Sequence, residues 1–190
     1  METQIFPCFY MLFAVAKFHS VTLFCPKDKK LVKETLISPL AITFVGDKKI
    51  LLIIDDEKEV HELIREYLGP VNAEIYSAYN GEEGVKLYKE LMAKNKRPDV
   101  VVMDLNLSGS RRYEDLKKQM IGKVMDGVKA TEELLKIDKN ANIIGFTAYA
   151  HLEWGKKLKK VGAKKVFGRE IGFDGFAKAI LKIISAPAGI

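Results

Sequence analysis

Three aspartates directly follow apolar segments, and this placement can bring their carboxylates together. Asp55 and Asp56 come after the apolar run 50–54, and Asp104 comes after the apolar run 100–103. If the two runs are neighbouring parallel strands, their carboxyl ends meet at the edge of the sheet where open α/β folds bind ligands. Clustered carboxylates repel one another, and a hard divalent cation relieves that repulsion. The three aspartates therefore predict a Mg²⁺ site, because Mg²⁺ takes a few carboxylate oxygens and keeps water at its other positions.

Two further segment ends supply groups that can bind an anion beside these acids. Thr147 and Ala148 close the fourth apolar run and offer a hydroxyl next to a side chain small enough to leave room for an oxyanion. Arg169 follows the short apolar pair at 166–167 and adds a permanent positive charge. An anion bound at Asp104 would meet Mg²⁺, a hydroxyl and a guanidinium. This combination predicts a site for phosphoryl transfer.

The segments that carry these residues alternate between two periodicities. Short apolar runs typical of buried strands alternate with stretches whose apolar residues recur at helical spacing. This alternation predicts an α/β fold, a doubly wound five-stranded parallel sheet in a three-layer sandwich, with the flavodoxin-like strand order 2-1-3-4-5. The first and third strands are neighbours in that order. Strands are expected at residues 50–54, 74–79, 100–103, 142–146 and 166–167, and helices at 60–68, 81–92, 128–137, 151–161 and 176–184.

Five short motifs occupy the expected strand ends and turns in one order along the chain. They are Ile53-Ile54-Asp55-Asp56, Val102-Met103-Asp104-Leu105-Asn106-Leu107, Met125-Asp126-Gly127, Thr147-Ala148-Tyr149-Ala150 and Val161-Gly162-Ala163. With these motifs, the segment from about Lys48 to Ser185 resembles the receiver domain of two-component response regulators.

The resemblance implies roles for individual residues. It implies that Asp104 is the phospho-acceptor, that Thr147 contacts the phosphoryl group, and that Arg169 stands where the family carries a lysine. It further implies a Mg²⁺ ion held by the side chains of Asp55, Asp56 and Asp104 and by the backbone carbonyl of Asn106. A sensor histidine kinase or a phosphotransfer protein would supply the phosphoryl group.

The predicted function is that of a single-domain response regulator in a phosphorelay, because no output segment follows the last expected helix. Such a protein is a phospho-acceptor with at most slow self-dephosphorylation rather than an enzyme. It signals by contact with an output protein, as a monomer or a homodimer. Two alternatives remain open. One is a degenerate receiver that acts as an unphosphorylated scaffold. The other is an aspartate-nucleophile phosphohydrolase of the haloacid-dehalogenase type, although that superfamily has an acid where this chain has Asn106.

Three departures from the family pattern bear on switching. Arg169 replaces the lysine, Glu170 replaces the following proline, and Val166 stands at the position of the aromatic switch residue. Period-two alternation is expected to turn the neighbouring Phe167 to the opposite face. An insertion at residues 110–124, with a helical pattern of its own, separates the acceptor from Met-Asp-Gly. It is interpreted either as a lid or docking element beside the site or as a surface loop.

Composition and charge restrict the remaining possibilities. The 190 residues carry a formal net charge of +6 and two cysteines, too few for a disulfide framework. Residues 155–190 hold nine basic side chains against two acidic ones. No recognisable RNA-binding or DNA-binding motif accompanies them, so nucleic acid is not expected as a partner. These features predict a cytoplasmic protein.

The first 47 residues differ in texture from the rest of the chain, because their apolar residues follow no clean period. The predicted organisation is an extension without an assigned role at 1–47 and a receiver domain at 48–190. The apolar segment 5–16 is shorter than the roughly 18–20 residues that cross a bilayer, and no positive charge precedes it, so a membrane is not expected as a partner. Of the histidines, His61 is expected on a helix surface.

Overall fold

The computed structural model describes residues 20–25, 30–35, 48–69, 73–110 and 112–185, and the chain forms two compact units, residues 1–43 and 44–190. In the first unit, strands β1 (Ser20–Cys25) and β2 (Lys30–Thr35) pair antiparallel, with Ser20 opposite Thr35. The sequence patterns did not indicate this hairpin, and the apolar segment 5–16 lies outside the described residues. Within the part of the chain that is described, no helix is long and apolar enough to cross a membrane.

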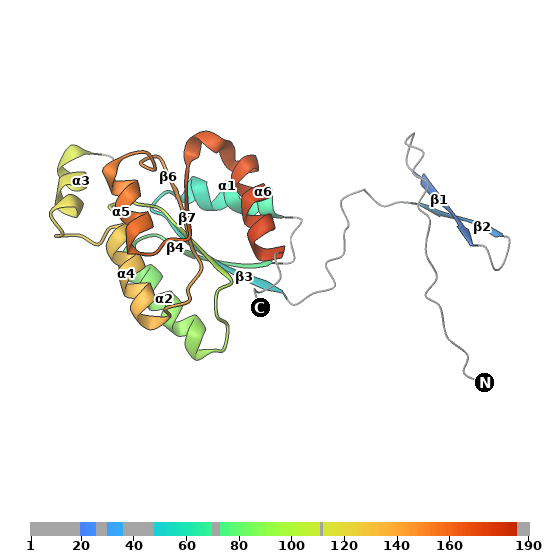
Figure 1. The fold of residues 1–190 in the computed structure, drawn as a ribbon, viewed down its shortest axis with the longest axis horizontal. Helices are drawn as coiled ribbons and strands as arrows, with labels where there is room; N and C mark the ends of the chain where they lie inside the picture. The colour runs from blue at the N-terminus through green and yellow to red at the C-terminus, as the bar shows by residue number, and fades with distance from the viewer. Residues whose placement is uncertain (1–19, 26–29, 36–47, 70–72, 111, 186–190) are drawn as a thin grey trace. The chain divides into compact units, whose positions relative to one another are not determined.

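The second unit is built on a parallel sheet of five strands (Figure 1). The strands are β3 (Lys49–Ile54), β4 (Ala73–Ala78), β5 (Val100–Met103), β6 (Ile143–Thr147) and β7 (Lys165–Gly168). Their spatial order is β4-β3-β5-β6-β7, which confirms the expected order 2-1-3-4-5. The central strands β5 and β6 are buried along their whole length, as their continuous apolar runs predict for strands covered on both faces.

Helices cover both faces of this sheet and complete three layers (Figure 1). The helices α1 (Lys58–Leu68) and α6 (Gly172–Ser185) pack on one face, and α2 (Gly81–Ala93), α4 (Gly127–Ile137) and α5 (Glu153–Val161) pack on the other. Alternate residues of β3 pack into the two hydrophobic cores, one on each face of the sheet. Leu51 and Ile53 pack with α1 and α6, whereas Leu52 and Ile54 pack with α2 and α4. The predicted three-layer sandwich is therefore confirmed.

The Met-Asp-Gly motif joins the start of α4 to the end of β5. The Gly127 N–H donates to the Leu105 carbonyl over 3.0 Å, and a Cβ atom at Gly127 would lie 2.0 Å from the Asp104 carbonyl oxygen. Only glycine fits that approach. Asp126 caps α4 by accepting from the Lys129 N–H at 2.8 Å, and its other carboxylate oxygen accepts from Trp154 Nε1 at 2.8 Å. The motif thus fixes the backbone of Asp104 from the side of α4.

The insertion contains the expected helix, α3 (Tyr113–Met120). Two large apolar side chains at the ends of this helix do not pack against the domain, since Tyr113 is 72% exposed and Ile121 is 59% exposed. Gln119 is buried, and its Nε2 donates to the Met125 carbonyl over 3.2 Å. A polar contact therefore fastens α3 next to the start of α4.

Candidate functional site

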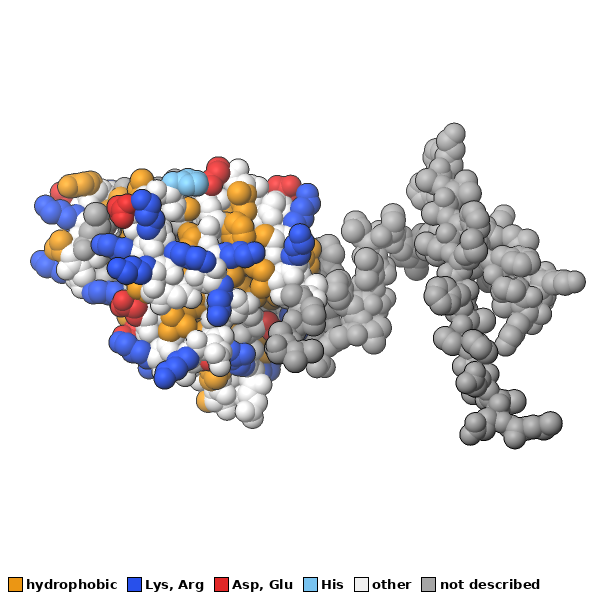
Figure 2. All heavy atoms as spheres, in the orientation of Figure 1, with side chains coloured by type: hydrophobic (Ala, Val, Ile, Leu, Met, Phe, Trp, Pro, Cys, Tyr) orange, Lys and Arg blue, Asp and Glu red, His pale blue; other side chains and the backbone are white. Residues whose placement is uncertain are grey.

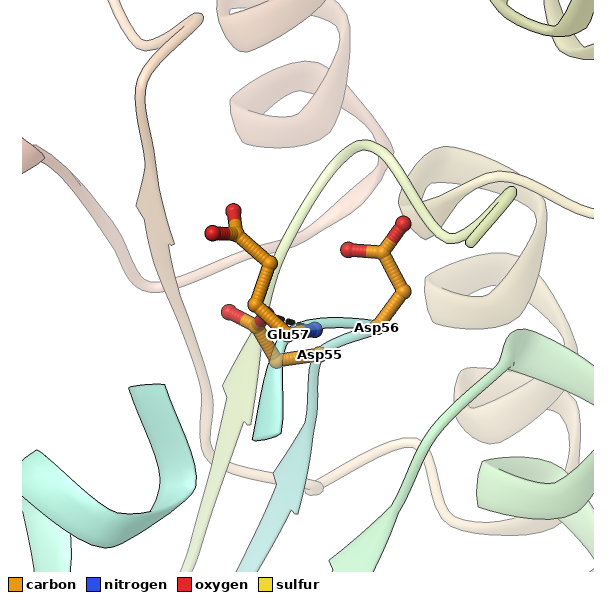
Figure 3. A group of neighbouring side chains, drawn as sticks. All are labelled: Asp55, Asp56 and Glu57. Atoms are coloured by element: carbon orange, nitrogen blue, oxygen red, sulfur yellow. Dashed lines mark hydrogen bonds between the residues drawn. The ribbon is translucent and has the colours of Figure 1, made fainter. Parts of the chain in front are cut away.

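The turn from β3 into α1 carries three consecutive acids. Asp55 is buried, Asp56 and Glu57 are partly buried, and one carboxylate oxygen from each lies within 4.8 Å of the others. Asp55 Oδ1 accepts from the Glu57 N–H over 2.9 Å, which closes the turn. Figure 3 shows the carboxylates of Asp55 and Glu57 on one side of this turn and that of Asp56 on the other. Glu57 was not among the residues that the sequence singled out, although it continues the Asp-Asp pair.

Asp104 lies beside this turn at the end of β5. Ile54 of β3 pairs with Met103 of β5, so Asp55 and Asp104 follow neighbouring strand ends. Asp104 is 4% exposed, and its Oδ2 accepts from the Asn106 N–H over 3.0 Å. Its Oδ1 is buried and has no hydrogen-bond partner among the described residues. The neighbouring end of β6 contributes Thr147, which is fully buried, followed by the exposed Ala148.

Arg169 connects these acids. It begins the short helix η1 (Arg169–Ile171) directly after β7, and its side chain is 20% exposed. Nη2 lies 2.8 Å from Asp55 Oδ2 and 3.5 Å from Asp104 Oδ1, and Nη1 lies 3.0 Å from Glu57 Oε1. The structure therefore brings Asp55, Asp104 and Arg169 together, as the strand order predicts.

The donor set of this site fits a hard divalent cation. Asp56 Oδ1, like Asp104 Oδ1, is buried without a hydrogen-bond partner in the described part of the chain. Carboxylate oxygens without a donor are the ligands that Mg²⁺ prefers. The other oxygen, Asp56 Oδ2, accepts from the Gly109 N–H over 2.8 Å. This hydrogen bond places the turn that leads into the insertion against the acids. Gly109 has a φ of 71°, a conformation that favours glycine.

The family follows from a match over most of the chain. Residues 51–181 match the response regulator receiver domain. The chain belongs to this family. Receiver domains are in general phospho-acceptors rather than enzymes, bind Mg²⁺ at an acidic pocket, and interact with kinases, phosphotransferases and output proteins.

Curated relatives agree with this family. The chain is 25% identical over 134 residues to the sporulation initiation phosphotransferase F of Bacillus subtilis, covering 70% of this chain and 92% of the relative. It is 29% identical over 138 residues to the chemotaxis protein CheY of Halobacterium salinarum, covering 73% of this chain and 98% of the relative. Both relatives are therefore matched along nearly their whole length.

Solved structures share the fold of the receiver domain. The non-phosphorylated HemR receiver domain of Leptospira biflexa superposes with a TM-score of 0.58 at 20% identity, covering 75% of this chain and 99% of that one. A chain of the CheX–CheY–BeF₃–Mg²⁺ complex of Borrelia burgdorferi gives a TM-score of 0.54 at 21% identity, covering 73% of this chain and 90% of that one. At these identities the likeness establishes the fold.

Burial raises the pKa values of the three aspartates of the site, Asp55, Asp56 and Asp104. Burial and the neighbouring Asp104 carboxylate raise the pKa of Asp55 to about 8, against the lowering effect of Arg169. Burial also raises the pKa of Asp104 to about 6, although Arg169 and Thr147 act in the opposite direction. The pKa of Asp56 is raised too, chiefly by burial. One guanidinium therefore does not offset the free-energy cost of ionising these buried carboxyls. A second cation bound beside them would lower that cost.

This cost predicts a pH-dependent difference in stability between the wild type and Asp104→Asn in EDTA. An unfolded aspartate titrates near about 3.9, whereas the folded Asp104 has a pKa of about 6. Between these values the folded wild type binds the extra proton, so its free energy of unfolding falls as the pH rises. The variant lacks this titration. Its stability relative to the wild type should grow by about 1–3 kcal/mol between pH 4 and 7.

Chemical denaturation of both proteins across this pH range measures the difference. The comparison cancels the titration of groups that lie away from Asp104. The variant also loses the raising effect of the Asp104 carboxylate on the pKa of Asp55, which enlarges the difference in the same direction. A difference that stays constant, or that shrinks as the pH rises, would contradict a raised pKa at Asp104.

His61 is buried, so the expected helix-surface position is wrong. Its side chain is 2% exposed, with Nε2 2.8 Å from the Asp55 carbonyl oxygen and Nδ1 2.8 Å from Ser77 Oγ. Burial lowers the pKa of His61, and a carbonyl can only accept, so the neutral ring carries its proton on Nε2. Arg65 also donates to Ser77 Oγ over 2.7 Å. The ring thus ties the acidic turn to β4.

A groove between α5 and β7 is lined in part by Ala150, from the loop that follows Thr147. It has a volume of about 440 Å³, and Lys156, Lys159 and Lys165 line it together with Val166. Val166 packs with the core of α2, α4 and α5, whereas Phe167 packs with that of α1 and α6, as alternation predicts. Figure 2 shows lysine and arginine side chains in blue around apolar ones on the face where α5 and β7 lie. The groove is therefore positively charged.

Proposed function

We propose that this receiver domain accepts a phosphoryl group on Asp104 from a histidine kinase or a phosphotransfer protein, and that it works in the cytoplasm. The observation that carries the proposal is the Asp104 carboxylate. Its Oδ1 is buried at the end of a central strand, has no hydrogen-bond donor in the described residues, and lies 3.5 Å from Arg169 Nη2. A carboxylate oxygen that has no hydrogen-bond donor and lies near a cation is suited to attack a phosphorus atom.

The residues around Asp104 account for the transfer. An Asp104 oxygen forms a bond to phosphorus while the bond to the donor breaks, and the leaving group departs with that electron pair. Asp55, Asp56, Asp104 and the backbone carbonyl of Asn106 would hold Mg²⁺, which when bound offsets negative charge on the phosphoryl oxygens. Thr147 would donate a hydrogen bond to one of these oxygens and Arg169 would pair with another. The exposed, small side chain of Ala148 would leave room for the phosphoryl oxygens next to Thr147.

Signalling would follow from movement of the loop at 147–152. Drawing Thr147 toward an acyl phosphate shifts the segment that leads into α5, and Val166 has no ring to reorient. We therefore expect the change to centre on this loop, on α5 and on the groove beside it. The lysines of the groove would favour an output protein with an acidic surface. In a homodimer, the same surface would form the contact between two copies of the chain.

Intact-mass spectrometry with acetyl phosphate tests the proposal. The wild type should gain about 80 Da, the mass of one phosphoryl group, in the presence of Mg²⁺ and not in EDTA. Hydrogen exchange should change at residues 147–161 in the same samples. No mass gain with acetyl phosphate or any kinase donor would favour an unphosphorylated scaffold, and turnover of phosphate monoesters would favour a phosphohydrolase.

A further inference from the structure

Arg169 occupies the position of a counter-cation in the acidic site. One guanidinium contacts three carboxylates, at 2.8 Å for Asp55, 3.0 Å for Glu57 and 3.5 Å for Asp104. Beneath it lies the ring of Phe146, whose centroid is 5.8 Å from the guanidinium carbon. The buried Nε of Arg169 has no hydrogen-bond partner among the described residues, so its hydrogen bonds to the described residues are made by Nη1 and Nη2 with carboxylates.

Asp55 is the acid that this guanidinium holds most closely. Asp55 Oδ1 already accepts from the Glu57 N–H and Oδ2 accepts from Arg169 Nη2, whereas Asp56 Oδ1 and Asp104 Oδ1 have no hydrogen-bond partner in the described chain. A divalent cation bound by these aspartates would share its ligands with Arg169. Two positive groups that share ligands at such short range repel each other strongly in a buried site.

We propose that Arg169 competes with the divalent cation for Asp55, so that cation binding moves the guanidinium off this carboxylate. The inference rests on the proposed function in one respect, namely that the aspartates bind Mg²⁺. Its consequence is that Arg169 weakens Mg²⁺ binding and becomes available to other anionic groups of the site only after Mg²⁺ has bound.

The shape of arginine makes this competition specific to the chain. Nη1 and Nη2 of one planar fork reach Glu57 and Asp55 at the same time. A lysine has a single ammonium at the end of its stem and cannot hold both carboxylates in the same way. An arginine at the position of the family's lysine is therefore expected to lower the divalent affinity of the site.

Mg²⁺ titrations of Arg169→Met and Arg169→Lys test the competition. Binding is measured by calorimetry and by thermal unfolding at about pH 8.5, where protons compete least for the acids. Arg169→Met should bind Mg²⁺ about fivefold or more tightly than the wild type, within the usual range of coupling between sites. Arg169→Lys, which keeps the charge, should lie between the two. Lys178→Met removes a charge from an exposed position of α6 and should leave the affinity unchanged.

Arginine side-chain NMR of the wild type adds a readout that does not depend on any variant folding. The Nε–H resonance of Arg169, assigned by its loss in Arg169→Lys, should shift along the Mg²⁺ titration with the same apparent affinity. Unchanged or weaker Mg²⁺ binding in both Arg169 variants, with binding still abolished by Asp56→Asn, would overturn the competition and leave the metal site standing. Absence of Mg²⁺ binding in all of these proteins would instead overturn the metal site itself, and with it the inference.

Discussion

Replacing Asp104 by asparagine is expected to abolish the phosphoryl adduct completely while leaving the receiver domain folded. Asparagine keeps the shape of the side chain and an oxygen for the Asn106 N–H, but its amide is not a nucleophile toward phosphorus. The variant also loses a buried carboxylate whose pKa burial raises to about 6, so at pH 8 its free energy of unfolding should not fall below that of the wild type. Intact mass after treatment with acetyl phosphate and Mg²⁺ measures the adduct.

A matched control separates the loss of the acceptor from a general loss of negative charge. Glu132→Gln makes the same change of charge at an exposed position of α4, and it should gain the full phosphoryl mass. A persistent adduct in Asp104→Asn would place the acceptor on another carboxylate. Fragmentation of the modified peptide would then distinguish Asp55 and Asp56 from acids elsewhere.

The sheet of this domain could be predicted from the sequence because its strands are apolar without interruption. The runs at 50–54 and 100–103 have no alternative amphipathic interpretation, and their burial in β3 and β5 follows from the helices on both faces. The hairpin of β1 and β2 could not be predicted in this way. Its residues, from Ser20 to Thr35, mix apolar and charged side chains without a clean period of two.

The meeting of Asp55 and Asp104 could be predicted because strand order alone determines it. The contact between Glu57 and Arg169 could not, since a long side chain on a turn can point in several directions and tertiary packing selects one. His61 is a different case. It precedes Ile64 by three residues and Leu68 by seven, both of them buried, so helical spacing did place it on the inner face of α1. Its polar character led to the wrong prediction, and the Asp55 carbonyl and Ser77 explain why a polar ring is stable there.

The acids also predict a second large effect, on metal binding. In the wild type, Mg²⁺ at about ten times its dissociation constant should raise the free energy of unfolding by about 1.4 kcal/mol, or the melting temperature by roughly 3–6 °C. Asp56→Asn should reduce this rise to below about 1 °C, because the substitution removes the charge of a carboxylate with an unpaired, buried oxygen. Differential scanning calorimetry with and without Mg²⁺ measures both values.

Asparagine is the informative substitution at this position because it leaves the local structure in place. Its side-chain oxygen can still accept from the Gly109 N–H, which Asp56 Oδ2 now does over 2.8 Å, so the turn that leads into the insertion should keep its conformation. The melting temperature in EDTA should accordingly stay equal to that of the wild type or exceed it, since burial raises the pKa of Asp56 and its charged form is costly. Glu132→Gln should retain the full Mg²⁺ effect. An undiminished rise in Asp56→Asn would show that Asp56 is not a ligand of Mg²⁺.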